Sequence, residues 1–280
     1  MGDQDNARNG VVITFFSTAS AVGKTLIACN MASEIARDAT VCLVDLDLQF
    51  GDVANFLQLQ DEYTIADAER DMNVQGDNCD VAPFLTLYEH GQVAFYCLTC
   101  PKDIAEAYNI KTSNVQRVIK QLQGMFDYIL VDTTSMFSEL NLAMLDMSTI
   151  VNFLGIVDFI PTIKNMKIGT DTLKRLGYDA QKIRLVLNRS DSKTNISMDD
   201  VERVLGQPFY HILPNDFRAA SQSIQNGVPL VLSGADTRLA ASLRELVDLY
   251  TDGRTRHGGG RQSRRETQES HSLFGRLFGH

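Results

Sequence analysis

The sequence predicts an α/β protein with a doubly wound, mostly parallel β-sheet flanked by helices. Apolar, strand-like runs alternate along the chain with segments of helical periodicity, an order that is typical of parallel sheets. Several of the runs are apolar at every position, as expected of strands that helices cover on both faces. Ligands of such sheets bind beyond the carboxyl ends of the strands, so we expect the chemistry in the loops that follow strands.

Each element is predicted by its own pattern of apolar residues. We expect strands at 11–16, 41–44, 93–98, 128–131, 149–155, 183–187 and 209–213. We expect helices near 24–37, 64–70, 112–123, 138–146, 161–176, 198–205, 216–226 and 237–251. The polar stretch 71–80 between two of these elements is expected to be a surface loop.

The composition indicates where the folded domain begins and ends. With 280 residues, 44% of them hydrophobic, the chain can form one large α/β domain or two small ones. Residues 1–9 are polar and expected to be disordered, and the alternating pattern covers 10–251. Residues 252–280 are expected to form a flexible basic tail. Its tip is apolar, with Leu273, Phe274, Leu277 and Phe278 on one stripe if the segment is helical.

Charge and cysteine content indicate which partners and which cellular compartment to expect. The tail from 252 holds six arginines and three acidic residues, a charge of +3, which leaves −12 for the rest of a chain of net charge −9. Such an acidic body repels DNA, although Arg218 and Arg238 are present. Five cysteines suggest no disulfide framework and fit a reducing cytoplasm. Cys97 and Cys100 have no second pair, so we expect ordinary thiols rather than a zinc site.

No apolar segment reaches the roughly 18 residues that a membrane span needs. We therefore expect a soluble protein, or at most a peripheral one.

A phosphate-binding loop is predicted between the first strand and the first helix. Gly23-Lys24-Thr25 stands there, after a short loop. Backbone N–H groups at the helix start would face the phosphates, the Lys24 ammonium would add charge, and the Thr25 hydroxyl could bind Mg²⁺. The full pattern G-x-x-x-x-G-K-[ST] is broken, because Thr18 holds its first glycine position. The alternative is a chance Gly-Lys pair at a helix start.

Carboxylates end two other strands. Asp45 and Asp47 close the second strand at i and i+2, where they point the same way and could reach Mg²⁺ or an attacking water. The alternative is a solvated acidic loop. Asp132 closes the apolar run 128–131, which matches the Walker B pattern, in which the acid belongs to the metal shell.

Two further strand ends carry polar residues. Asn188 and Arg189 follow the run 183–187, where the Asn amide could read an adenine edge or simply form a turn. Pro214-Asn215-Asp216 could belong to a base pocket, but a helix cap by Asn215 or Asp216 is favoured.

Together these motifs resemble the MinD/ParA group of P-loop ATPases, and so imply a P-loop NTPase fold over residues 10–250. The stretch from Asp45 to Ala54 is similar to the TadZ/CpaE branch, which acts in polar localisation and assembly of Flp/Tad-type pili. The apolar tip of the tail also resembles that branch. Many relatives carry an N-terminal receiver-like domain, which is expected to be absent or trimmed here.

The resemblance implies a role for each matching position. ATP or ADP would bind Asn188, Arg189 and the loop and helix start Ala21, Val22, Gly23, Lys24, Thr25 and Leu26. Thr25, Asp45 and Asp132 would hold Mg²⁺, and Asp47, with Lys24, would act in catalysis. It also implies a nucleotide-sandwich homodimer in the cytoplasm, at the cell pole or at the inner face of the membrane.

Two departures from the family pattern affect the expected activity. Ala19 stands where the family has its signature lysine, and Ser20 and Ala21 stand where it has two glycines. Thr134 replaces the proline that usually follows the Walker B Asp-Thr. Without that cation, slow turnover or binding without turnover is expected. The sequence therefore predicts a weak ATPase that controls dimerisation and polar placement of a pilus or secretion assembly. A non-enzymatic localisation scaffold is the alternative, and a small-molecule kinase or synthetase is a third reading, for which no substrate motif is present. The tail tip would dock a partner or touch a membrane.

Overall fold

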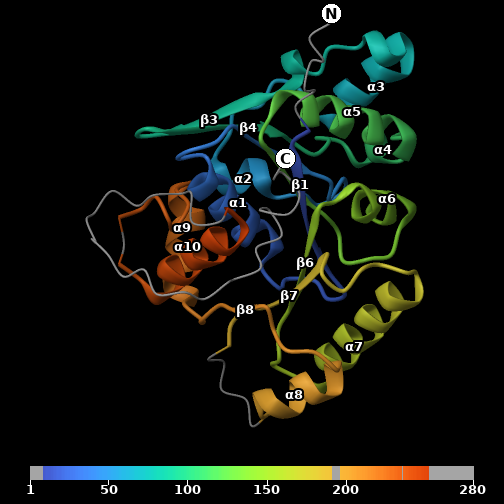
Figure 1. The fold of residues 1–280 in the computed structure, drawn as a ribbon. Helices are drawn as coiled ribbons and strands as arrows, with labels where there is room; N and C mark the ends of the chain where they lie inside the picture. The colour runs from blue at the N-terminus through green and yellow to red at the C-terminus, as the bar shows by residue number, and fades with distance from the viewer. Residues whose placement is uncertain (1–8, 191–195, 235, 252–280) are drawn as a thin grey trace, which may run out of the picture.

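The computed structural model describes residues 9–190, 196–234 and 236–251 (Figure 1). The expectations for the tail 252–280 and for residues 1–8 therefore lie outside the described residues. Within the described part, one sheet of eight strands has the order β3-β4-β2-β5-β1-β6-β7-β8. Neighbouring strands run parallel except β3 and β4, which are antiparallel. The predicted fold class is confirmed.

The strands are β1 Val11–Ser17, β2 Val41–Asp45, β3 Thr86–His90, β4 Val93–Leu98, β5 Tyr128–Asp132, β6 Ile150–Gly155, β7 Ile183–Leu187 and β8 His211–Ile212. The α-helices are α1 Lys24–Ile35, α2 Val53–Leu57, α3 Ile65–Gln75, α4 Ile104–Ala107, α5 Thr112–Met125, α6 Glu139–Met147, α7 Ile160–Arg175, α8 Met198–Leu205, α9 Phe217–Asn226 and α10 Arg238–Thr251. None of these helices is both long and apolar enough to cross a membrane.

Helices cover both faces of the sheet (Figure 1). Helices α1, α2, α9 and α10 share one apolar core with the sheet. Helices α3, α5 and α6 pack on the other face, and α7 and α8 continue that layer beside β6 and β7. All seven residues of β1 are buried, which is why this strand reads as a continuous apolar run.

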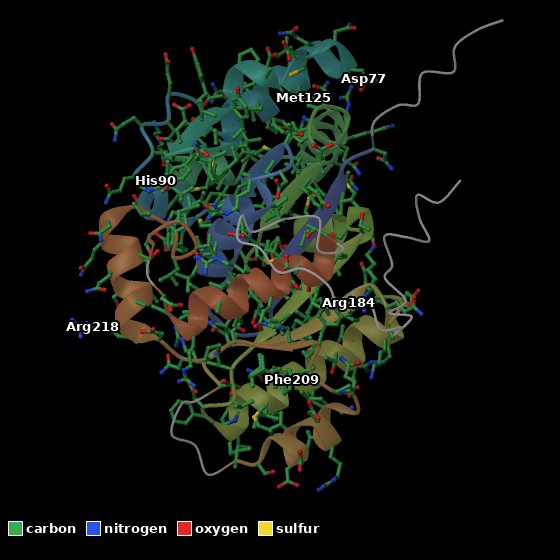
Figure 2. The ribbon with its side chains drawn as sticks, turned by 60° about the vertical axis from the view of Figure 1, so that its left-hand side comes forward. Asp77, His90, Met125, Arg184, Phe209 and Arg218 are labelled. Atoms are coloured by element: carbon green, nitrogen blue, oxygen red, sulfur yellow. The ribbon has the colours of Figure 1, made fainter. Side chains whose placement is uncertain are left out.

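The sequence reading was wrong for the stretch 71–80, which is not a surface loop throughout. Helix α3 continues to Gln75 and is followed by a single 3-10 turn, Gly76–Asn78. Met72 is fully buried against α5, and Arg117 of α5 pairs with Asp77 at 2.7 Å. Figure 2 shows Asp77 at the end of the molecule where α3 and α5 lie. Packing on α5 thus extends a helix that the polar sequence did not predict.

Some short elements were missed, and one strand is shorter than expected. Strand β3 and helices α2 and α4 have five, five and four residues, too few to produce a clear periodicity. The strand expected at 209–213 is reduced to His211–Ile212, although Tyr210 and Leu213 still donate backbone hydrogen bonds to β7.

Candidate nucleotide and metal site

The loop between β1 and α1 has the backbone of an anion-binding loop. Gly23 has φ 95° and Ala21 has φ 56°, both in the left-handed region. A Cβ atom on Gly23 would lie 2.6 Å from Asn188 Nδ2, so only glycine fits there. Helix α1 begins at Lys24, and no side chain caps its first turn. The N–H groups at this helix start are therefore open to an anion in the adjacent cavity.

Thr25, which follows this loop in α1, contacts Asp132 at the end of β5. The Thr25 hydroxyl donates to Asp132 Oδ2 at 2.6 Å, although 107 residues separate them in the chain. The other oxygen, Asp132 Oδ1, is buried and has no hydrogen-bond partner among the described residues. Burial raises the pKa of Asp132 to about 6, against the opposing effect of the Thr25 hydrogen bond and of Lys24.

Asp45 lies beside Asp132, because the two residues are paired in the register of β2 and β5. Its Oδ1 accepts from the Asp47 backbone N–H and its Oδ2 from that of Val53, both at 3.1 Å. Burial, and then the neighbouring Asp132 charge, raise the pKa of Asp45 well above its usual range. Asp45 thus shapes the loop that carries Asp47.

This donor set fits a divalent cation. A hydroxyl and carboxylate oxygens are the ligands that Mg²⁺ prefers. Among the described residues, Asp132 Oδ1 is buried and accepts no hydrogen bond, and the buried carboxyl groups of Asp45 and Asp132 stand side by side. Thr25 and Asp132 are the residues placed to hold the ion. A direct ligand role for Asp45 stays a prediction, because both of its oxygens already accept backbone hydrogen bonds.

Asp47 and Lys24 both line the same cavity of about 770 Å³. Asp47 Oδ1 accepts from the Phe50 backbone N–H at 3.3 Å, and its carboxylate is close enough to raise the pKa of Asp132. Lys24 Nζ donates to Ser135 Oγ at 3.1 Å. The sequence reading missed Ser135, whose only signal is a hydroxyl residue just after the acidic end of a strand.

Asn188 and Arg189 hold the outer side of the loop. Asn188 Nδ2 donates to the Val22 carbonyl at 2.8 Å, and Arg189 Nη2 donates to the Ala21 carbonyl at 3.1 Å. Both residues also line the cavity. Contact of their side chains with adenine stays a prediction. The Val22 side chain is fully buried in the core, so Val22 offers a ligand only its backbone.

The rest of the cavity wall comes from distant segments. Asp47, Asn55, Thr134 and Leu26 line it from the first half of the chain, and Pro214, Asn215 and Asp216 line it from the second half. Asp216 caps α9 by accepting from the Ala219 backbone N–H at 3.0 Å. The predicted helix cap is confirmed, and the same segment is also part of the cavity wall.

A comparison with protein families identifies this arrangement. The family model of the CobQ/CobB/MinD/ParA nucleotide binding domain matches residues 13–230. The chain belongs to this family. It is 24% identical over 251 residues to the septum site-determining protein MinD of Thermotoga maritima, covering 85% of this chain and 87% of that protein.

Solved structures of MinD and ParA proteins share the fold. A ParA family ATPase from Chlorobium tepidum superposes with a TM-score of 0.77 at 20% identity, over 86% of this chain and 98% of that chain. MinD from Pyrococcus horikoshii, complexed with Mg-ADP, gives a TM-score of 0.71 at 20% identity, over 85% and 95%. In this MinD/ParA-type nucleotide-binding domain, Lys24 and Thr25 begin α1, which follows β1, and Asp132 ends the adjacent strand β5.

Cys97 and Cys100, which were predicted to be ordinary thiols, are both free cysteines. Cys97 is buried in β4, and Cys100 lies half-buried beside the Gly51 carbonyl. Burial raises the pKa of Cys100 to about 12, so its thiol is protonated and poorly nucleophilic at neutral pH.

Proposed function

We propose that this chain binds ATP and ADP together with Mg²⁺ in the cavity above β1, β2 and β5, and that it hydrolyses ATP slowly. The observation that carries the proposal is the Thr25–Asp132 contact, with the unpartnered Asp132 Oδ1, under the open first turn of α1. Membership of the MinD/ParA family supports it.

Each residue has a proposed part in binding. The N–H groups of Gly23, Lys24, Thr25 and Leu26 would donate to the phosphates, and the Lys24 ammonium would add a positive charge. Thr25 and Asp132 would hold Mg²⁺, and Asp45 is a further candidate ligand beside Asp132. The ion would neutralise negative charge on the phosphate oxygens. Ala21 and Val22 would contribute backbone atoms only. Asn188 and Arg189 would contact the base.

Asp47 is the proposed group that orients the attacking water, because it lines the cavity and its carboxylate lies near Asp132. Slow turnover is proposed because Ala19 stands where the family pattern has a lysine. A missing cation leaves negative charge in the transition state less stabilised. The same observation favours a second candidate function, a scaffold that binds nucleotide without turnover.

The proposed biological role is a cytoplasmic, dimeric localisation factor for a Flp/Tad-type pilus or secretion assembly. Its support is the sequence from Asp45 to Ala54, which resembles the TadZ/CpaE branch. Partners would be pilus or secretion proteins at the cell pole, and the tail tip would dock such a partner or touch the membrane surface. DNA is not proposed as a partner: Arg218 lies exposed on α9 (Figure 2), but the body of the chain is acidic.

Calorimetric titration with Mg²⁺-ATP tests the proposal. The Lys24→Ala variant should lose ATP affinity by at least tenfold, because the phosphates lose a charged hydrogen-bond donor. Asp47→Ala should bind ATP like the wild type and lose any phosphate release. Unchanged ATP affinity in Lys24→Ala would contradict the proposed site.

The turnover assay separates the two candidate functions. Phosphate release that requires Mg²⁺ and disappears in Asp47→Ala indicates the slow ATPase. Tight ATP binding with no release above that of Asp47→Ala indicates the scaffold.

A further inference from the structure

Ser135 connects the phosphate-binding loop to the loop that follows β5. Its hydroxyl donates to the Ala19 carbonyl at 2.8 Å and accepts from Lys24 Nζ at 3.1 Å. The residue is half-buried and lines the cavity. Because the hydroxyl hydrogen is used on Ala19, an oxygen lone pair is left to face the Lys24 ammonium. One side chain therefore holds both the backbone of the loop and its cation.

The loop that presents Ser135 is braced on both sides. Thr133 Oγ1 donates to the Phe15 carbonyl in β1 at 2.7 Å. The buried Asn141 amide donates to Thr134 Oγ1 and to the Met136 carbonyl, both at 2.7 Å. The threonine at 134, where the family pattern has proline, thus supplies an acceptor for Asn141. These contacts determine where the Ser135 hydroxyl can stand.

The hydrogen-bond donors of Lys24 indicate the effect of the bridge that Ser135 forms between Lys24 and Ala19. A lysine ammonium has three N–H donors, and among the described residues only Ser135 accepts a hydrogen bond from Lys24. The two remaining donors are free for a ligand in the cavity. A nucleoside triphosphate offers oxygens on both its β- and γ-phosphates to such a lysine, whereas a diphosphate lacks the γ-phosphate.

We infer that Ser135 is a positioning residue that orients the Lys24 ammonium and so favours nucleoside triphosphates over diphosphates. The inference rests on the proposed nucleotide binding at this site. Without the serine, the flexible lysine side chain must lose more freedom to place two donors at once. A diphosphate lacks the γ-phosphate, so the Lys24 side chain loses less conformational freedom when it binds a diphosphate than when it binds a triphosphate.

Calorimetry with Mg²⁺ and either a non-hydrolysable ATP analogue, AMP-PNP, or ADP tests this role. Ser135→Ala should weaken AMP-PNP binding about tenfold, the scale of one hydrogen bond to a charged group. ADP affinity should change by less than about twofold. Ser135→Thr keeps the hydroxyl and should restore AMP-PNP affinity. Equal weakening of both nucleotides, or of neither, would overturn the inference, as would failure of the threonine variant to rescue.

Hydrogen exchange on the nucleotide-free protein supplies an independent readout. Amides of residues 18–24 should exchange faster in Ser135→Ala than in the wild type or in Ser135→Thr, because the link to Ala19 is lost. Unchanged exchange would overturn the bridge itself. If the wild type bound neither nucleotide, the proposed function would fail, and the exchange data alone would show whether the bridge exists.

Discussion

At the scale of single residues, the main feature is a pair of carboxyl groups buried side by side. Burial raises the pKa of both Asp45 and Asp132. A carboxyl group with a raised pKa in the folded state binds protons more tightly there than in the unfolded chain. It therefore lowers the free energy of unfolding as pH rises from the pKa of the unfolded chain through that of the folded state. The site therefore costs stability at neutral pH unless a cation binds.

Asp132→Asn should accordingly separate binding from stability. The amide removes one buried charge, so the unfolding midpoint should rise by about 2–4 °C, which corresponds to about 1 kcal/mol for a domain of this size. The increase in ATP affinity that Mg²⁺ causes should fall at least tenfold. Differential scanning calorimetry and titration with and without Mg²⁺ measure the two effects.

Asp200→Asn on α8 is the matched control, since Asp200 is an exposed carboxylate paired with Arg203. It should change neither quantity. A lower midpoint in Asp132→Asn would show that the carboxylate stabilises the empty site.

At the scale of elements, β8 is attached to α10 through His211. Its Nε2 lies 2.9 Å from the Ser242 carbonyl and 2.8 Å from Ser242 Oγ. Burial lowers the pKa of His211 below its ordinary value of 6.5, against the opposing effects of the Ser242 carbonyl and Glu245. Burial of the ring therefore favours the neutral imidazole at the place where the short strand packs against the helix.

This contact predicts a pH dependence. The unfolded chain binds a proton at His211 more tightly than the folded one, so the contribution of His211 to stability is lost as pH falls below about 6.5. Urea denaturation at pH 7.5 and 5.5 should show a larger loss of unfolding free energy for the wild type than for His211→Gln. Parallel losses in the two proteins would contradict the assignment.

The same scale shows why some elements escaped the sequence. Strand β1, which is buried throughout, and helix α5, which is buried along one face, carry a clear apolar pattern, and their positions were predicted well. Helix α2 has five residues and forms where Asp45 accepts the Val53 N–H. This partner lies eight positions earlier in the chain and is buried, so a local sequence window does not contain the contact.

At the scale of the whole molecule, apolar side chains surround the mouth of the cavity. Phe50, Met136 and Phe217 line it and are 72%, 63% and 73% exposed. They come from three separate segments, which only the fold brings together. Exposed aromatic and methionine side chains at one rim are typical of a protein-protein contact surface, and they support the proposed homodimer.

Dimerisation can be measured by light scattering on a sizing column. With Mg²⁺-ATP, the wild type should show twice the monomer mass, and Phe217→Glu should remain a monomer because a charge would be buried in the contact. Val74→Glu is the control, because Val74 on α3 is 79% exposed and does not line the cavity. A monomeric wild type under all nucleotide conditions would contradict the proposed dimer.

Local patterns in the sequence were enough to predict the fold class and the order of the long elements, and they singled out Gly23, Lys24, Thr25 and Asp132 as candidate site residues. These features depend on local patterns: apolar runs, helical periodicity and polar residues at strand ends. The contacts of Asp45 with the loop after β2, of Asn188 with the Val22 carbonyl and of Ser135 with Lys24 became visible only in the folded chain. Contacts of this kind join residues that are distant in the chain, and they follow from strand order and register, which no local pattern contains.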